Sequence, residues 1–377
     1  MTKVIIYGLG KTYVKIKDKL ISEYDIVALT DGDSLKREQC TDGLVKTPHE
    51  AIEVLKKSGD VNVLIAVSRN VFQKEILSFL SENGIDSGRI VSPKIIDSIE
   101  SIAEFSINAN FETVLHDYYV DVDALVKISG VSFNVDPFSE IYRENVFKVH
   151  QMITGDEYNT LNEGYNTDDS ERVDVMVNVT MSDIDNLLRS GHHKDLEDII
   201  NEVGATSSDR IIDMGFGFGF SLLNFAKVND RVIGIDTSPK LHAVVNRLLK
   251  ELNLSAKLVL DDFYGISKID GCFDIIYFHA SFHHCNDPMK LLKILPDKLE
   301  NNGRIIFAQE QIQPDAIYPW NIGMETNAAF LQVCKRKWFE GLFREDFFLE
   351  MLRRSGLRVD RTFASGTGTK NYVVKKV

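Results

Sequence analysis

The chain has 377 residues, which is too long for one ordinary domain and predicts two or three folded units. Acidic residues outnumber basic ones by 56 to 43, giving a formal net charge of −13. Because phosphate backbones are bound by clustered Lys and Arg, and no basic stripe occurs in this acidic chain, we expect no nucleic-acid partner.

The cysteines are far apart and form no CxxC pair: Cys40, Cys272, Cys285 and Cys334. This usage is typical of a reducing compartment and argues against a structural zinc site. Met1 leads directly into an apolar segment, and no apolar run reaches ~18 residues, so we expect neither a signal peptide nor a membrane span. The sequence predicts a cytoplasmic protein and leaves a homo-oligomer open.

Residues 1–98 alternate strand and helix patterns. The predicted strands are Val4–Tyr7, Asp25–Leu29 and Val61–Val67. Thr47-Pro48-x-Glu50 is a capping box with proline at the first helical position, so it predicts a helix through Leu55. A further helix is expected to end near Asn83-Gly84. This alternation predicts a small parallel α/β domain.

The first turn of this domain carries an incomplete nucleotide-binding fingerprint. Gly8-x-Gly10 is followed by Tyr13 where the dinucleotide motif has a third glycine, and Asp31 stands at the position of a ribose-binding acid. The domain resembles the nucleotide-binding domain in front of some bacterial sugar acetyltransferases and other surface-sugar enzymes. Two roles stay open: binding of NAD or a nucleotide-sugar, and a scaffold or oligomerisation role.

Residues 99–200 show a different pattern. We expect helices at Phe111–Leu125 and Ser182–Leu188, with the polar, turn-rich segment Gly155–Tyr165 between them. A mainly helical connector that covers the mouth of a second sheet as a lid fits this pattern, and an inert spacer is the alternative.

The most informative motif lies in 201–377. The apolar run at Ile211 ends in Asp213 and three alternating glycines, and a second apolar run from Val232 ends in Asp236. In a doubly wound sheet, such glycines let a ligand approach the backbone at the carboxyl edge. A carboxylate one crossover later can accept both hydroxyls of a ribose. The spacing differs from GxGxxG.

These motifs resemble motif I and its successors in the class I S-adenosylmethionine-dependent methyltransferases. The third, fourth and fifth strands of that family are matched by Leu258–Phe263, Phe273–Ala280 and Asn302–Ala308, and its terminal hairpin by Leu357–Phe363 and Asn371–Lys376. The resemblance implies a seven-stranded sheet over 201–377 with a substrate insertion at about 311–343. The predicted fold class is therefore α/β, with two Rossmann-like doubly wound sheets joined by the connector.

The resemblance also implies S-adenosylmethionine as the cofactor and a set of residues that bind it. Asp236 would hold the ribose, Asp262 the adenine amino group, and the glycines the rest of the molecule. The predicted cofactor residues are Asp213, Gly215, Phe216, Gly217, Gly219, Asp236, Thr237, Asp262, Phe263 and His279.

Methyl transfer from a sulfonium needs alignment of the acceptor and, for a hydroxyl, removal of a proton. Candidate bases follow the fourth and fifth strands: His279, His283 and Glu310. A packing role for either histidine and a solvated loop acid for Glu310 are the alternatives. No carboxylate ends the fourth strand, where catechol-type enzymes bind their metal, so the sequence predicts no metal.

The predicted substrate residues are Tyr318, Trp320 and His284. Tyr318-Pro319-Trp320 and Lys337–Gly341 resemble segments of methyltransferases from bacterial surface-polysaccharide gene clusters, although Asn321 and Leu342 depart from that pattern. Aromatic rings can stack on the apolar face of a sugar. Burial of both tryptophans as ordinary core is the alternative.

Together these features predict a methyltransferase acting on a small polar acceptor, with a sugar hydroxyl on a nucleotide-sugar or surface glycan preferred. A natural-product or other small-molecule methyltransferase is the alternative. Two further hypotheses are an NAD-dependent sugar oxidoreductase working through the first domain and a catalytically silent cofactor-binding subunit.

Overall fold

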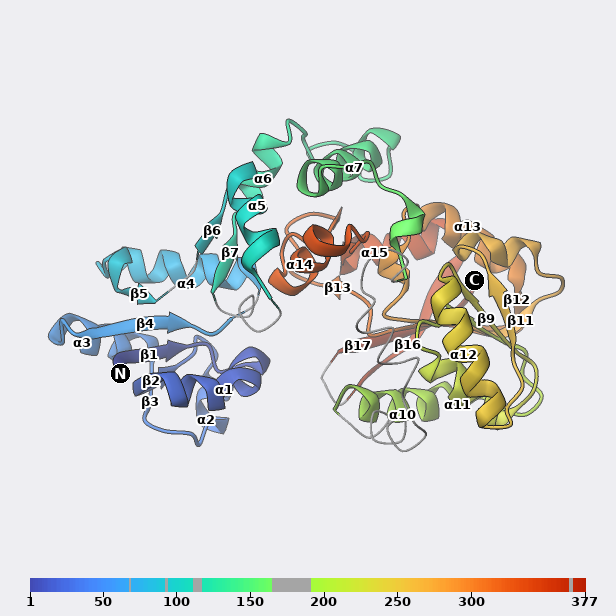
Figure 1. The fold of residues 1–377 in the computed structure, drawn as a ribbon, viewed down its shortest axis with the longest axis horizontal. Helices are drawn as coiled ribbons and strands as arrows, with labels where there is room; N and C mark the ends of the chain where they lie inside the picture. Colours follow the sequence, from blue (N-terminus) through green and yellow to red (C-terminus); the bar gives the residue numbers. More distant parts are fainter. Residues whose placement is uncertain (68, 92–93, 111–116, 165–190, 366–368) are drawn as a thin grey trace. The chain divides into compact units, whose positions relative to one another are not determined.

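The computed structural model describes residues 1–67, 69–91, 94–110, 117–164, 191–365 and 369–377 (Figure 1). These residues form two compact units. Unit 1 comprises Met1–Val135, Gln151–Gly155 and Gly323–Lys335, and unit 2 comprises Asp136–His150, Asp156–Ile322 and Arg336–Val377. The boundaries expected at 98 and 200 stay a prediction about separately folding parts.

Unit 1 contains a parallel sheet in the order β3-β2-β1-β4-β5. Its strands are β1 (Thr2–Tyr7), β2 (Tyr24–Thr30), β3 (Val45–Lys46), β4 (Val61–Ile65) and β5 (Ile90–Val91). Its helices are α1 (Lys11–Glu23), α2 (Ser34–Gln39), α3 (Pro48–Lys57) and α4 (Asn70–Glu82). Alternate strand residues pack with α1 on one face and with α3 and α4 on the other, so the sheet is covered on both sides (Figure 1).

Local sequence signals explain where the helices of unit 1 begin and end. The side chain of Thr47 accepts the amide of Glu50 at 3.3 Å, and Glu50 accepts the amide of Thr47 at 2.8 Å, so both halves of the capping box are present. Helix α4 ends at Glu82, and Gly84 then adopts a φ of +76°, which glycine tolerates without strain. The predicted α3 and the predicted end of α4 are confirmed.

A short parallel strand pair joins unit 1, formed by β6 (Lys94–Ile96) and β7 (Tyr118–Val120) beside α5 (Ile99–Asn108) and α6 (Val122–Ile128). The helix predicted over Phe111–Leu125 is therefore wrong at β7, where three buried residues pair with β6. Its segment 111–116 and the helix predicted at Ser182–Leu188 lie outside the described residues. The amide of Asn327 in α14 (Asn327–Arg336) donates to the Tyr118 carbonyl at 2.6 Å, which anchors β7.

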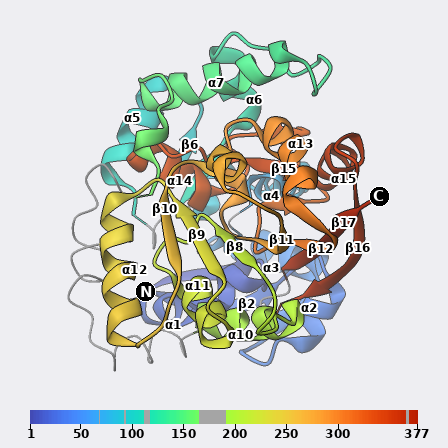
Figure 2. The same ribbon diagram turned by 90° about the vertical axis from the view of Figure 1, so that its right-hand side faces the viewer.

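Unit 2 is built on a seven-stranded sheet in the order β10-β9-β8-β11-β12-β17-β16 (Figure 2). The strands are β8 (Ile211–Met214), β9 (Val232–Asp236), β10 (Lys257–Leu260), β11 (Phe273–His279), β12 (Leu299–Ala308), β16 (Leu357–Ala364) and β17 (Lys370–Lys376). Only β17 runs antiparallel to its neighbours β12 and β16, as the terminal hairpin predicts. The predicted fold class is confirmed: α/β, with a small parallel N-terminal sheet and this seven-stranded sheet.

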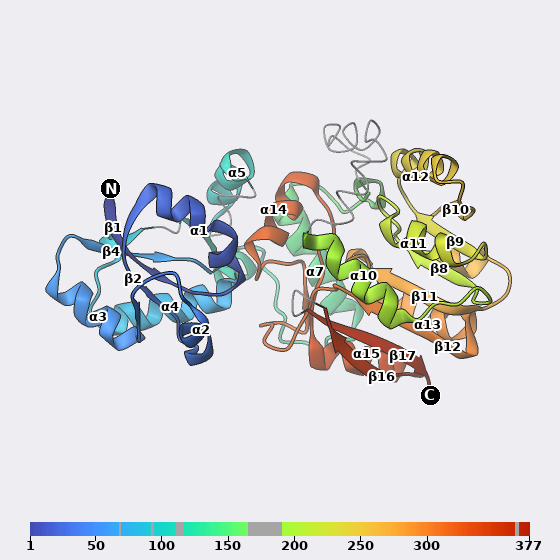
Figure 3. The ribbon, with the colours of Figure 1, turned by 90° about the horizontal axis from the view of Figure 1, so that it is seen from below.

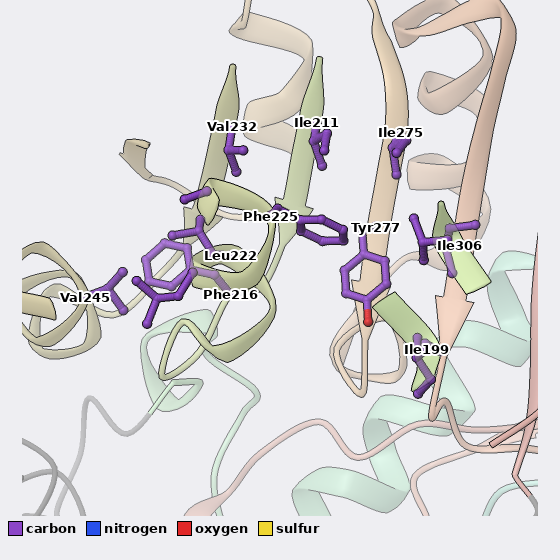
Figure 4. Packing of buried hydrophobic residues seen from close by; sticks show 14 of the residues in the cluster. Ile199, Ile211, Phe216, Leu222, Phe225, Val232, Val245, Ile275, Tyr277 and Ile306 are labelled. Atoms are coloured by element: carbon purple, nitrogen blue, oxygen red, sulfur yellow. The ribbon is translucent and has the colours of Figure 1, made fainter. Parts of the chain in front are cut away.

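One face of this sheet packs against α10 (Gly191–Val203), α11 (Phe220–Val228) and α12 (Pro239–Glu251) (Figure 3). The close-up in Figure 4 shows the rings of Phe225 and Tyr277 side by side in this core, with their centroids 5.0 Å apart. The opposite face has its own aromatic core. In it, the ring centroid of Phe307 lies 4.9 Å from that of Phe282 and 5.2 Å from that of Phe348 in α15 (Glu345–Arg354). Successive β12 residues alternate between the two cores.

Unit 2 also contains shorter elements and one further crossover helix. They are the residues of α7 (Glu140–Thr154) up to His150, the 3₁₀ segments η3 (Thr160–Asn162), η4 (Phe263–Lys268) and η5 (Phe282–His284), helix α13 (Pro288–Lys298), and the strands β13 (Ile312–Gln313), β14 (Trp320–Asn321) and β15 (Leu342–Arg344). Within the described part of the chain, no helix combines the length and the apolar composition that a membrane crossing requires.

We predict that Gly234→Ala destabilises unit 2 by about 1–3 kcal/mol, because overpacking forces neighbours to shift. A Cβ at Gly234 would lie 2.2 Å from Leu222 and 2.7 Å from the Phe216 ring. Urea unfolding followed by tryptophan fluorescence measures the change, since Trp320 and Trp338 both belong to unit 2. Gly59→Ala in unit 1, where a Cβ meets nothing within 4 Å, is the control and should leave this transition within ~0.5 kcal/mol. Equal transitions in both variants would contradict the prediction.

Candidate cofactor and acceptor site

The turn after β8 contains three glycines with left-handed backbone, and other residues closely approach two of them. Gly215 has a φ of +77°, and a Cβ there would lie 2.9 Å from the Cβ of Ser281. Gly219, at the start of α11, has a φ of +81°, and its Cβ would lie 2.7 Å from a methyl of Val245. Left-handed backbone and close approach together explain these glycines. Gly217 also has a left-handed φ, of +53°, but a Cβ there would meet nothing within 4 Å, so this glycine borders open space.

A cavity of about 770 Å³ lies at the carboxyl edge of the sheet. Every predicted cofactor residue except Gly219 lines it: Asp213, Gly215, Phe216, Gly217, Asp236, Thr237, Asp262, Phe263 and His279. Other lining residues come from distant segments, namely Tyr158, Glu163, Tyr264, His284, Asn286 and Trp338. The structure therefore brings the predicted set together, and Gly219 contributes the tight start of α11 behind it.

Asp236 ends β9 with its carboxylate held by backbone. One oxygen accepts the amide of Gly217 at 2.9 Å and the other accepts the amide of Ser238 at 2.9 Å. Burial raises the pKa of Asp236 to about 6, although these amides oppose the rise. Each oxygen keeps a lone pair, so the carboxylate can accept ligand hydroxyls while it stays oriented.

Asp213 differs from Asp236 because neither of its buried oxygens has a hydrogen-bond partner of good geometry among the described residues. Burial, followed by the nearby charge of Asp236, raises the pKa of Asp213 to about 8. A buried carboxylate without partners is costly. Since Asp213 also lines the cavity, a cationic ligand group beside it would relieve this cost.

The three predicted bases occupy different environments. His279, at the end of β11, is half-buried and lines the cavity, and its Nδ1 lies 3.0 Å from the Tyr277 hydroxyl. The buried residues Glu310 and His283 are absent from the residues that line the cavity. Among the three, only His279 therefore faces the space where an acceptor could bind.

Glu310 instead ties the end of β12 to the turn after β11. Its Oε1 accepts the amides of Ser281 and Phe282, each at 3.0 Å. Its Oε2 accepts the amide of His283 at 3.0 Å and lies 2.7 Å from the Nδ1 of the same residue. Although burial opposes it, hydrogen bonds from His283 and these amides hold the pKa of Glu310 below its ordinary value. A carboxylate with these contacts orients η5 and is poorly placed to take a proton.

His284 stands at the cavity wall next to residues from two distant segments. Its Nδ1 lies 3.0 Å from Oε2 of Glu163. The centroids of the His284 and Trp338 rings are 5.5 Å apart in an edge-to-face arrangement. Although burial opposes it, the charges of Glu340 and Glu163 raise the pKa of His284 to about 9. The predicted substrate residue His284 therefore lines the cavity beside the ring of Trp338 and the carboxylate of Glu163.

The segment containing Trp338 is clamped onto η5 by backbone. The amide of Gly341 donates to the His283 carbonyl at 2.8 Å, and a Cβ at Gly341 would lie 2.5 Å from that oxygen. The amide of Phe339 donates to Glu163 at 2.7 Å. Glycine at 341 is thus required by close approach, and it brings Trp338 and Glu340 to the site.

The other two predicted substrate residues lie elsewhere. Trp320 is buried in β14, where its carbonyl accepts the Tyr142 hydroxyl at 2.8 Å and its ring stacks on Phe343. Neither Trp320 nor Tyr318 lines the cavity. Sequence reasoning omitted Tyr158, Glu163 and Glu340 from the site. The motif at 337–341 is the signal that could have found Glu340, whereas nothing in the polar segment 155–165 singles out Glu163.

Comparison with known proteins agrees with this geometry. Residues 212–307 match the protein family described as Methyltransferase domain. An uncharacterized methyltransferase of Schizosaccharomyces pombe is 27% identical over 177 residues, covering 44% of this chain and 65% of the relative. A Methanobrevibacter smithii protein named "Probable cobalt-precorrin-6B C(15)-methyltransferase (decarboxylating)" is 31% identical over 111 residues, covering 29% of this chain and 57% of the relative. The chain thus spans less than two thirds of the length of either relative.

Among solved structures, magnesium protoporphyrin IX methyltransferase of Synechocystis with bound S-adenosylmethionine matches with a TM-score of 0.40 and 14% identity, over 57% of this chain and 94% of that one. Through the family match over residues 212–307, the chain contains a methyltransferase domain, as motif I and the following strands predicted.

We predict that the empty protein loses stability as the pH rises from about 4 to 8, in part through Asp213. The folded form keeps a proton on Asp213 up to about pH 8, whereas the unfolded chain releases it near pH 4, so ionisation penalises the folded state across this window. Asp213→Asn removes that penalty. The free energy of unfolding of Asp213→Asn, relative to that of wild type, should rise by more than about 1 kcal/mol from pH 5 to pH 8. Melting temperatures of both proteins at the two pH values measure this change.

Asp230→Asn, at an exposed position, is the matched control and should follow wild type at both pH values. A constant difference between Asp213→Asn and wild type from pH 5 to pH 8 would contradict the assigned protonation.

Proposed function

We propose that this protein is an S-adenosylmethionine-dependent methyltransferase that methylates a small polar acceptor. The observation that carries the proposal is the cradle of Asp213, Gly217 and Asp236 at the carboxyl edge of a methyltransferase domain. S-adenosylmethionine carries an α-amine and a sulfonium, both cationic, and a ribose with two hydroxyls. An unpartnered buried carboxylate and a second carboxylate with spare lone pairs fit these groups.

When bound, the cofactor supplies an electrophilic methyl group. The protein supplies the alignment: the glycine turn lets the cofactor approach the backbone, Asp236 holds the ribose, and Asp262 with Phe263 contacts the adenine. Asp262 is kept in place because its side chain accepts the amide of Tyr264 at 2.9 Å. Fixing the donor against an oriented acceptor is the main catalytic contribution expected for such a displacement.

For the acceptor, we favour a sugar hydroxyl on a nucleotide-sugar or a surface glycan, which would place the enzyme in carbohydrate biosynthesis in the cytoplasm. The support is the pairing of Trp338 and Tyr158 with Glu163 and His284 on the cavity wall, since rings stack on sugar faces and carboxylates bind hydroxyls. A natural-product acceptor is the alternative, because the same rings would also suit an aromatic substrate.

His279 is the base that we propose for the acceptor hydroxyl. It lines the cavity, and the Tyr277 hydroxyl next to its Nδ1 can fix the tautomer that leaves the other ring nitrogen able to accept a proton. We do not assign the base role to the other two predicted bases, Glu310 and His283. Glu310 instead orients the His283 ring and the backbone of η5.

We do not assign the activity to unit 1. Tyr13, at the third glycine position, lies in α1, is 2% exposed and packs in the core between α1 and the sheet. The carboxylate of Asp31 accepts the amide of Leu9 at 2.7 Å and the amide of Asp33 at 2.8 Å. These contacts favour a structural role for this turn over NAD-dependent oxidation of a sugar. A silent cofactor-binding subunit would bind the cofactor without turnover, so the activity assay below separates it.

We predict that Asp236→Asn weakens binding of S-adenosylhomocysteine about tenfold or more, because charge-assisted hydrogen bonds contribute roughly 1.5–3 kcal/mol. Isothermal titration calorimetry measures the affinity, and Asp230→Asn on the exposed surface serves as the control. Unchanged affinity in Asp236→Asn would remove the ribose assignment.

We predict that His279→Ala lowers turnover by ~10²- to 10⁴-fold, the usual contribution of a positioned base. The assay is mass spectrometry of a nucleotide-sugar pool incubated with enzyme and methyl-labelled cofactor. Affinity for S-adenosylhomocysteine, measured on the same variant, shows whether the loss lies in chemistry or in cofactor binding. Turnover within a few-fold of wild type would mean that the proton leaves through another group.

A further inference from the structure

The adjacent histidines of η5 share one arrangement. Each has its Nδ1 against a carboxylate: His283 Nδ1 lies 2.7 Å from Glu310 Oε2, and His284 Nδ1 lies 3.0 Å from Glu163 Oε2. The two glutamates come from separate segments of unit 2: Glu310 follows β12 and Glu163 follows η3. A carboxylate on Nδ1 fixes the ring orientation and leaves Nε2 as the nitrogen on which a metal ion would take the place of a proton.

Both Nε2 atoms are directed to one further carboxylate. His283 Nε2 lies 3.6 Å from Oε2 of Glu340, and His284 Nε2 lies 4.0 Å from Oε1 of the same side chain. One ligand atom from each of the three residues falls within 4.8 Å of the others. These separations are too long for hydrogen bonds. Ligand atoms around a tetrahedral ion at about 2.1 Å, however, lie roughly 3.4 Å apart, so the observed spacing is near that of a metal site.

We propose that His283, His284 and Glu340 bind a divalent transition-metal ion, with Zn²⁺ as the reference ion, and that Glu310 and Glu163 orient the two histidines. Metal-binding histidines commonly donate their other ring N–H to a carboxylate. His283 has that hydrogen bond to Glu310, and Glu163 lies 3.0 Å from the Nδ1 of His284 as an ion-pair partner. Two imidazoles and a carboxylate favour Zn²⁺, Co²⁺ or Fe²⁺ over Mg²⁺ or Ca²⁺, which prefer oxygen ligands.

Further contacts hold the side chains of Glu340 and Glu163 in place independently of an ion. Gln311 Nε2 donates to Glu340 Oε2 at 2.7 Å, and the amide of Phe339 donates to Glu163 Oε1 at 2.7 Å. The amide of Gly341 holds the following backbone on the His283 carbonyl. Preformed ligands with their own supports are what a resident metal site requires.

A network of ion pairs without a metal is the competing explanation. It accounts for the two short Nδ1 contacts, but it leaves both Nε2 atoms facing Glu340 beyond hydrogen-bond distance. An ion between them satisfies both nitrogens and the carboxylate together. His284 also lines the cavity, so the ion could bind an acceptor oxygen there and act as a Lewis acid. This role rests on the proposed function. The binding of the ion does not depend on that function.

The test uses the full chain, stripped of metals by a chelator and titrated with Zn²⁺ and, separately, with Co²⁺. We expect one equivalent of Zn²⁺ by calorimetry and a visible absorption band on Co²⁺ binding. Glu340→Gln, which keeps the shape of the ligand, should weaken Zn²⁺ at least tenfold and change the Co²⁺ band. Glu310→Gln should weaken Zn²⁺ about 10- to 100-fold, the usual cost of losing an orienting carboxylate.

His49→Gln, an exposed histidine in unit 1, is the matched control and should bind as wild type does. S-adenosylhomocysteine affinity measured on every sample shows that unit 2 is folded, and it separates a failed metal site from a failed cofactor assignment. Absence of stoichiometric Zn²⁺ binding in folded wild type, or equal Zn²⁺ binding by wild type and Glu340→Gln, would overturn the proposal and leave the ion-pair network.

Discussion

The buried carboxylate of Glu310 is the contact on which both sides of the site depend. It gathers three successive amides and one imidazole at the junction of β11 and β12, where parallel strands end and their backbone would otherwise lack partners. The same turn places Ser281, whose hydroxyl donates to the Met214 carbonyl at 2.6 Å, against the glycine turn. One side chain therefore sets both the floor of the cofactor cavity and the orientation of His283.

The electrostatics of the cavity follow from its carboxylates. Burial and the nearby charge of Asp236 disfavour the ionised form of Asp213, and burial also raises the pKa of Asp236. The nearby charge of His284 opposes the rise in the pKa of Asp236. The proposed donor brings its own positive charge, so its binding should relieve a strain that the empty protein carries. At the other side of the cavity, Glu163 and Glu340 surround His284, and a cation is again the group that balances them.

The sequence was most informative where local rules decide the structure. Apolar runs, glycine turns and the box at Thr47 and Glu50 act over a few residues, so the strands of the larger sheet and the residues of the proposed cofactor cradle could be predicted. In the smaller sheet β1, β2 and β4 were predicted, whereas the two-residue strands β3 and β5 were not. Tyr118–Val120 was predicted as helix because pairing with β6 is a tertiary effect. Trp320 shows the same limit: its motif suggests substrate contact, but packing against Phe343 decides its burial.

The acidic side chains show where prediction from sequence ends and why. A glutamate at the end of a fifth strand is consistent with a base, yet Glu310 is surrounded by donors that only the folded turn after β11 supplies. The expectation of no metal considered carboxylates next to the fourth strand, whereas Glu340 and Glu163 reach η5 from distant segments. Gly341 is what makes the approach of Glu340 feasible, because a Cβ at position 341 would lie 2.5 Å from the His283 carbonyl oxygen and push this segment away from η5. The chemistry of this site therefore depends on a backbone contact between two segments, and no single motif contains it.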